Sequence, residues 1–191
     1  MENVYTISVH GIGTPHSHYI LQTRLNNSYN ITHLVFTFDW TKLTLASVAK
    51  KLDKFIDMCV PRGKKVVLIG HSAGGRVILH SKHRSVIGLI AIAAPLGGSF
   101  FLTLFKKPAV WWYGPLIGEL AKPHGFLGKP LITITAAYFC GFDGRMFESS
   151  MHHLEEIDTF KLNWSWHSGR QVYNDETIKY IISSISTFLK N

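Results

Sequence analysis

The sequence has few cysteines and few charged residues for its length. Only two cysteines, Cys59 and Cys140, occur among 191 residues, which excludes a disulfide framework as the basis of the fold. Each cysteine lies at the end of an apolar run, and we therefore predict two buried free thiols. Charged residues make up 17% of the chain and hydrophobic residues 46%, a composition that excludes a disordered chain and is typical of a globular protein.

Signals for secretion and for membrane insertion are also lacking. The N-terminal residues enter a strand pattern at once, without a basic segment or a cleavable apolar segment, which predicts a cytoplasmic protein. Residues 85–105 are uncharged and numerous enough to cross a bilayer, but a Pro-Leu-Gly-Gly-Ser cluster at 95–99 is typical of a turn. We predict that this stretch contains a buried strand at Val86–Ala93, followed by a loop, and no transmembrane helix.

Motifs for nucleic acid and for metal are missing, although the chain is basic. The net charge is +8. Lysine and arginine are scattered in short pairs without an RNA-recognition signature or zinc-finger spacing, so we predict no nucleic-acid partner. The pairs His16/His18 and His152/His153 lack a Cys/His quartet or a His-Glu-x-x-His pattern, and exposed positions at loop ends explain them. We therefore predict no metal and no cofactor.

Short apolar runs alternate with amphipathic helical patterns along the chain. We predict strands at Val4–Val9, Leu34–Phe38, Val66–Ile69, Val86–Ala93, Leu131–Phe139 and Phe160–Trp166. Apolar residues recur at helical spacing from Leu45 to Ile56 and from Ile178 to Leu189. Because the strands are continuous apolar runs, the sheet is expected to be covered on both faces. The sequence thus predicts a single α/β domain over 1–191, with a doubly wound, mostly parallel sheet of about six strands.

A serine between small residues follows the third predicted strand. The segment Gly70-His71-Ser72-Ala73-Gly74 connects this strand to a helical pattern. In such a turn the small residues avoid collisions with the neighbouring strand and helix, and the serine oxygen is exposed at the carboxyl edge of the sheet. A turn that serves packing alone is the alternative. The strand before the turn and the helix after it favour a nucleophilic Ser72.

A nucleophilic serine needs a base late in the chain, just ahead of the last helix. His167 lies there and is the candidate base. His152 and His153 are competitors, but they precede the last predicted strand. His71 is rejected because adjacent residues on a sharp turn point apart. A structural histidine at position 167 is the alternative.

The base in turn needs a carboxylate that orients its imidazole. Asp143 follows the fifth predicted strand in a Gly-flanked turn and is the candidate acid, although Asp-Gly also favours simple turns. Asp158 and the pair Glu155-Glu156 remain alternatives. The chain order Ser72, Asp143, His167 is the nucleophile–acid–base order expected of this architecture.

The loop after the first strand and the residue after Ser72 are candidates for an oxyanion hole. The negative oxygen of an acyl-transfer intermediate needs two preorganised N–H donors. We nominate the backbone N–H of Ala73, directly after the nucleophile, and that of Ile12 in the loop Val9–Gly13. The Gly-x-Gly of this loop is no dinucleotide fingerprint, because His16 stands where the third glycine would be.

An insertion rich in aromatic residues follows the fourth predicted strand, at residues 97–129. Its prolines argue against one long helix, and its position is where a lid over an active site would insert. The alternative is a satellite core that only covers the sheet. The candidate lid or acyl-binding residues are Phe100, Phe101, Leu104, Trp111 and Trp112.

Five segments in this order resemble the α/β-hydrolase superfamily and, within it, small lipases and carboxylesterases. Val9–Gly13 resembles the oxyanion loop of small bacterial lipases, and Gly70–Gly75 resembles their nucleophile elbow. Ala94–Ser99 resembles the Thr-Pro-x-x-Gly-Ser loop of many lipases, with alanine in place of the threonine. Asp143-Gly144 resembles the acid loop and His167-Ser168-Gly169 the base loop.

We therefore expect two-step acyl transfer to water on carboxylic esters with an apolar acyl chain. Thioesters, or ester bonds on lipid-modified proteins, are alternative substrates for the same chemistry, and the fold does not distinguish them. A non-catalytic hydrolase-fold module that binds lipid or a protein is the alternative from another class. The expected partner is a small-molecule or lipid ester, with peripheral contact to lipid interfaces, while the sequence leaves the oligomeric state open.

Overall fold

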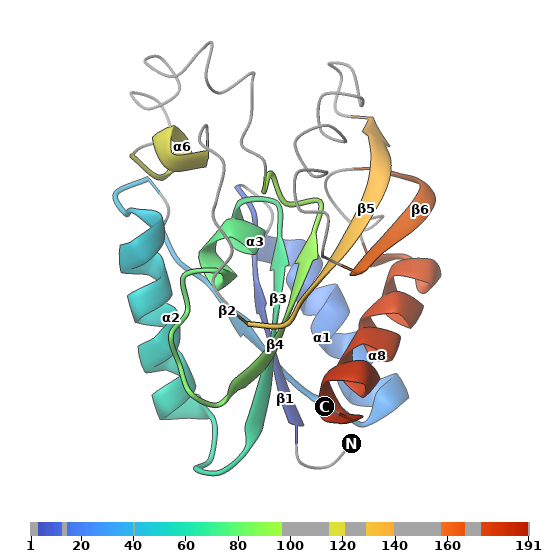
Figure 1. The fold of residues 1–191 in the computed structure, drawn as a ribbon, viewed down its shortest axis with the longest axis horizontal. Coiled ribbons are helices and arrows are strands. Elements are labelled where there is room, and N and C mark those ends of the chain that lie inside the picture. The colour runs from blue at the N-terminus through green and yellow to red at the C-terminus, as the bar shows by residue number, and fades with distance from the viewer. Residues whose placement is uncertain are drawn as a thin grey trace.

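The computed structural model describes a parallel sheet with helices on both of its faces (Figure 1). The described residues are 4–12, 15–39, 41–96, 115–120, 129–139, 158–166 and 173–190. The strands are β1 (Val4–Val9), β2 (Thr32–Phe36), β3 (Lys65–His71), β4 (Val86–Ile92), β5 (Leu131–Phe139) and β6 (Asp158–Trp166). The helices are α1 (Pro15–Tyr29), α2 (Leu45–Cys59), α3 (Ala73–Ile78), α6 (Pro115–Leu120) and α8 (Asp175–Lys190).

The order of the strands creates one reversal point in the sheet. The order is β2-β1-β3-β4-β5-β6, and all neighbouring strands pair in parallel. The chain moves from β1 outward to β2, then returns to β3 on the other side of β1 and continues outward from there. In open α/β sheets, ligands bind outside the carboxyl ends of the strands at such a reversal. The loops after β1 and β3 flank this point.

Two apolar clusters pack against the two faces of the sheet. Strand β3 contributes to both, because Val66 and Leu68 lie in one cluster while Val67 and Ile69 lie in the other. This alternation explains the continuous apolar run, since a strand covered on both faces needs apolar residues at every position. Helices α2 and α3 cover the first cluster, and α1 and α8 cover the second (Figure 1).

The predicted fold class is confirmed, and the bounds of β1 and β5 agree with the sequence. Strand β2 begins and ends two positions before the predicted Leu34–Phe38, because its first residues are polar. Thr32 is exposed. His33 is buried, and its two ring nitrogens are hydrogen-bonded to the hydroxyl groups of Thr6 and Ser8 in β1. Hydrophobic patterning gives no signal for either residue.

Two further features differ from the sequence-based expectations. Helix α1 was not predicted, because polar residues interrupt its apolar positions. Cys59 is a free thiol but is exposed, so the predicted burial is wrong there. It is the last residue of α2, beyond Ile56, where the buried stripe of this helix ends. Cys140 lies outside the described residues.

None of the helices within the described ranges is both long enough and apolar enough to span a bilayer. Within the uncharged stretch 85–105, Val86–Ile92 form β4, a buried central strand, close to the predicted Val86–Ala93, and residues 97–105 lie outside the described ranges.

Candidate active site

Ser72 lies at the turn between β3 and α3 in a strained backbone conformation. Its φ is 52° and its ψ is −121°, a region that residues with a β-carbon rarely occupy. The Ser72 N–H donates to the carbonyl of Ile92 at 2.8 Å, and the Ser72 carbonyl accepts from the Gly75 N–H at 3.0 Å. The turn is therefore tied to β4 on one side and to α3 on the other, which holds the strain in place.

The glycines around Ser72 stand where the chain comes closest to its neighbours. A β-carbon at Gly70 would lie 2.5 Å from the carbonyl oxygen of Gly74, and one at Gly74 would lie 2.1 Å from the carbonyl oxygen of Val9. A β-carbon at Gly75 would lie 2.3 Å from Cβ of Ala94. The spacing of small residues is therefore a steric requirement of this strand–turn–helix.

The loop after β1 packs directly against Ser72. A β-carbon at Gly11 would lie 2.8 Å from Cβ of Ser72, so only glycine permits this approach. The ring of His10 positions the loop, because its Nδ1 lies 2.7 Å from the Gly11 carbonyl oxygen while its Nε2 accepts the Phe38 N–H at 3.3 Å. This pair of bonds requires the proton of the neutral ring on Nδ1. Ile12, the nominated donor, follows in the chain and is partly buried.

Buried histidines lie beneath the loop that follows β1. His18 of α1 is fully buried, with its ring centroid 6.3 Å from that of His10 and 6.2 Å from that of His71. Burial, reinforced by the neighbouring histidines, lowers the pKa of His18 to about 2. Burial also lowers the pKa of His10. The floor of the site is thus neutral at physiological pH.

Tyr173 links this floor to the start of the last helix. Its side chain is buried, and its hydroxyl oxygen lies 3.2 Å from both ring nitrogens of His18. Arg24 of α1 donates to the Tyr173 carbonyl at 2.7 Å and forms an ion pair with Asp175. Tyr173 comes shortly after His167 in the sequence. The segment with the candidate base therefore ends at a residue that α1 anchors.

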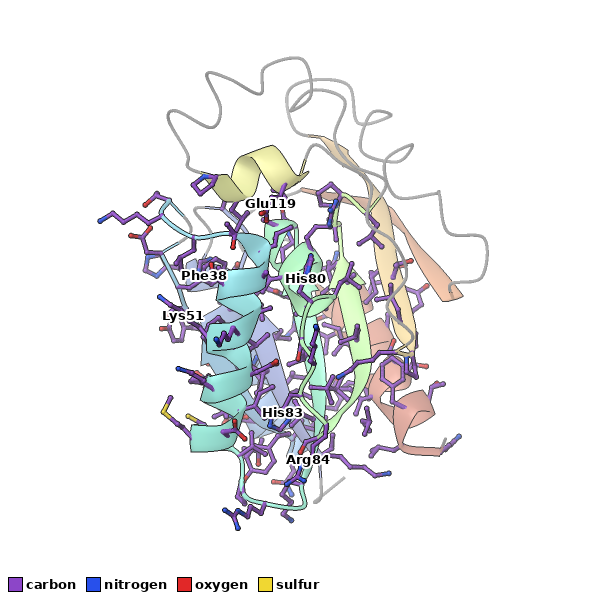
Figure 2. All side chains as sticks on the ribbon, turned by 60° about the vertical axis from the view of Figure 1, so that its left-hand side comes forward. Phe38, Lys51, His80, His83, Arg84 and Glu119 are labelled. Atoms are coloured by element: carbon purple, nitrogen blue, oxygen red, sulfur yellow. The ribbon has the colours of Figure 1, made fainter. Side chains whose placement is uncertain are left out.

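A buried arginine in α3 connects the site to α6. Arg76 is 2% exposed and donates to the carbonyl of Pro95 at 2.8 Å and to that of Glu119 at 3.5 Å. The Glu119 carboxylate accepts the Leu45 N–H at 2.7 Å, at the first residue of α2. Burial lowers the pKa of Arg76 to about 10, against the opposing effect of Glu119. These bonds fix α6 above the N-terminus of α2 (Figure 2).

The structure brings together only part of the predicted site. It places Ser72, Ala73 and the Gly11–Ile12 loop at one edge of the sheet. Asp158 begins β6, and its side chain is not described. The predicted residues that lie outside the described ranges are Asp143, His167, His152, His153, Glu155, Glu156, Phe100, Phe101, Leu104, Trp111 and Trp112.

Part of the predicted insertion packs on the core. Leu116 and Leu120 of α6 are buried in the first apolar cluster. This segment of the insertion covers the N-terminal end of α2, as expected of a satellite core. The lid role of the rest of the insertion stays a prediction.

One histidine interpretation is corrected by the structure. His16 is exposed as expected, but His18 is buried and bonded to Tyr173, so it is no loop-end histidine. The described residues contain no group of three or more His, Cys, Asp and Glu side chains that could hold a metal ion. The roles of His18 and Arg24 were missed because no local pattern pairs them with residues of the C-terminal helix.

Together, the sheet order and the strained serine at a strand–helix turn define a class of doubly wound α/β protein with a sharp turn after a central strand. The model of the alpha/beta hydrolase family matches residues 6–175, and because this match covers most of the chain, the protein belongs to that family. A search of the curated proteins found no match by sequence.

Solved structures of similar fold include esterases and a lipase at low identity. A thermophilic esterase from Thermogutta terrifontis superposes with a TM-score of 0.67 at 12% identity, covering 97% of this chain and 90% of that chain. A methylesterase from Arabidopsis has a TM-score of 0.64 at 15% identity, with 96% and 99% covered. A monoacylglycerol lipase from Paleococcus ferrophilus has a TM-score of 0.62 at 15% identity, with 99% and 95% covered. These similarities support the fold.

Proposed function

We propose that the protein is a lipase-like serine esterase that hydrolyses carboxylic esters with an apolar acyl chain. Ser72 is the nucleophile, His167 the general base and Asp143 the carboxylate that orients the imidazole. The backbone N–H groups of Ile12 and Ala73 hold the oxyanion. No cofactor takes part in this chemistry.

The observation that carries the proposal is the backbone conformation of Ser72, with φ 52° and ψ −121°. A serine that only filled a turn would be more stable as glycine in this region. Its strain is explained by a need to present a hydroxyl group at the reversal point of the sheet. The close packing of Gly11 on Ser72 supports an oxyanion site on the same side.

The reaction proceeds in two steps. The Ser72 oxygen attacks the ester carbonyl carbon while His167 takes the hydroxyl proton, and the oxyanion forms against the Ile12 and Ala73 amides. The ester C–O bond then breaks, and His167 returns the proton to the leaving alcohol. In the second step His167 removes a proton from water, which attacks the acyl carbon. The bond between the acyl carbon and the Ser72 oxygen then breaks, and His167 returns the proton to that oxygen, which releases the acid and free Ser72.

An apolar acyl chain suits the composition of the insertion at 97–129. This segment contains Phe100, Phe101, Leu104, Trp111 and Trp112. Aromatic and aliphatic side chains are the usual lining of sites for apolar ligands. The esterases and the lipase among the proteins of similar fold support ester substrates as a class.

Covalent labelling with a fluorophosphonate probe tests the nucleophile without requiring the natural substrate. We expect labelling of the wild type and its complete loss in Ser72→Ala. Hydrolysis of p-nitrophenyl esters should fall by about a thousandfold or more in the same variant. Ser183→Ala is the matched control, because it removes an exposed serine of α8 and should leave both signals unchanged.

Other outcomes distinguish the alternative functions. If the folded wild type resists labelling even with detergent or lipid present, the catalytic proposal is wrong and a binding module is favoured. If the wild type is labelled, a series of p-nitrophenyl esters and acyl thioesters of increasing chain length defines the substrate. His167→Ala and Asp143→Asn should each lower kcat, while Asp158→Asn should leave it unchanged.

A further inference from the structure

A basic depression lies at the amino edge of the sheet, far from Ser72. It has a volume of about 640 Å³, within the range of sites for small molecules. The C-terminal turn of α2, the turn before β3 and the turn before β4 form its walls. Its lining residues are Ile56, Asp57, Val60, Pro61, Arg62, Gly63, Lys64, Lys65, His83, Arg84, Ser85 and Ile87.

The charge of this lining is strongly unbalanced. It contains four cationic side chains, Arg62, Lys64, Lys65 and Arg84, but only one carboxylate, Asp57. Within the part of the chain that the structure describes, no carboxylate forms an ion pair with Arg62, Lys65 or Arg84. These cations gather from two separate turns and repel one another, which an anion bound between them would relieve.

The single carboxylate is already engaged within the lining. The Ser85 N–H donates to Nδ1 of His83 at 3.2 Å, so the proton of the neutral ring is on Nε2. That nitrogen donates to the Asp57 carboxylate at 3.1 Å. Lys129 donates to the His83 carbonyl at 2.8 Å and holds the same turn. The turn that carries Arg84 is therefore fixed, and Asp57 is occupied.

We propose that this depression binds a small soluble anion that carries phosphate groups. Arginine and lysine side chains are the usual donors to phosphate oxygens, and the cations of two turns can contact more than one such group. The walls of Ile56, Val60 and Ile87 are aliphatic, and the lining contains no phenylalanine, tyrosine or tryptophan. Its one aromatic ring, the imidazole of His83, is held at both nitrogens by Asp57 and Ser85, so the site offers little stacking surface for a nucleobase. A non-aromatic, multiply charged phosphate compound fits this lining.

The position of the depression favours a soluble anion over a lipid headgroup. Strand β3 runs from Lys65 in the lining to His71, next to Ser72. Seven residues of strand separate the two ends by roughly 20 Å. Figure 2 shows Arg84 near the lower end of the coloured ribbon and Glu119 near its upper end. A bilayer docked at the amino edge would therefore face away from the elbow.

Calorimetric titration with sodium pyrophosphate as the probe tests the proposal independently of hydrolase activity. We expect saturable binding by the wild type that persists at physiological ionic strength. The double variant Arg62→Ala/Arg84→Ala should bind about tenfold or more weakly. The matched control is Lys50→Ala/Lys51→Ala, which removes the same charge from exposed positions on α2 and should change the affinity by less than about twofold.

Three results would overturn the proposal. The wild type could fail to saturate, or both double variants could weaken pyrophosphate binding equally, which would reduce the effect to net charge. In a parallel arm, vesicles of phosphatidylcholine with phosphatidylglycerol are sedimented with each protein. Vesicle binding that depends on Arg62 and Arg84, without saturable pyrophosphate binding, would identify a membrane contact instead. Thermal melts confirm that each variant is folded.

Discussion

The two edges of the sheet are built in opposite ways. At the carboxyl edge, a β-carbon at Gly74 would lie 2.1 Å from the Val9 carbonyl oxygen, and His18 is fully buried in a neutral form. At the amino edge, a β-carbon at Gly63 would meet no atom within 4 Å, and Arg62 is exposed. Among the described residues, the carboxyl edge is tightly packed around neutral histidines, whereas the amino edge is open and cationic.

This difference shows where the fold holds its strained conformation. A serine at positive φ persists only where the surroundings determine its position, and close glycine contacts together with buried polar bonds provide that support at the carboxyl edge. The side chains described at the amino edge are more exposed and less tightly packed. Several cationic side chains can therefore lie there with little loss of folding free energy, and their charge can attract an anion over a long range.

The largest contrast between the edges should come from their glycines. Gly74→Ala would force a methyl group against backbone of β1, and we expect the free energy of unfolding to fall by about 4 kcal/mol or more. Gly63→Ala has open space but a φ of 82°, so its cost should be about 1 kcal/mol. Urea denaturation measures both, and equal losses would contradict the contrast.

The second-largest difference in stability should come from replacing an arginine at each edge. Arg76→Ala removes a buried guanidinium and leaves the Pro95 carbonyl without its donor, which should cost about 3 kcal/mol of stability. Arg62→Ala removes an exposed side chain with no ion pair among the described residues and should change stability by less than about 0.5 kcal/mol. Thermal and urea unfolding of both variants measure the two changes in the free energy of unfolding. A loss in Arg76→Ala as small as that in Arg62→Ala would contradict the prediction.

The smallest effect concerns pH and the buried histidines. The pKa of His18 is about 2 in the folded protein and about 6.5 in the unfolded chain. Between these values only the unfolded state binds the proton, so stability is full above about pH 6.5 and falls as the pH is lowered. At about pH 5 the loss from this one group should be about 2 kcal/mol.

Urea unfolding between about pH 7.5 and about pH 5 checks this prediction. His18→Gln should show a shallower fall in stability with decreasing pH, because the unfolded state then binds one proton fewer. His16→Gln is the matched control, since it removes an exposed histidine from the same helix. Identical pH profiles for His18→Gln and the wild type would show that His18 does not contribute this loss.

The elements that were predicted from the sequence are those with a local signal. β1 and β5 were found at their observed bounds because apolar runs specify a buried strand. The strand–turn–helix at Ser72 was predicted because its small residues follow an apolar run and precede a helical pattern, while the nucleophilic role of Ser72 stays a prediction. Helix α1 was missed because it is polar over most of its surface, and the exposed position of Cys59 was missed because an apolar run does not mark where a buried stripe ends.

By itself, the sequence determined the alternation of strands and helices and the position of the strained serine, because both depend on short-range patterns and sterics. Only the tertiary structure decided which distant groups meet. Tyr173 and Arg76 take their partners from separate elements, His18 and Arg24 of α1 in one case and Pro95 and Glu119 in the other. The basic depression likewise joins two turns that are apart in the chain. These contacts depend on how the sheet orders its strands, and that order is a property of the packed chain.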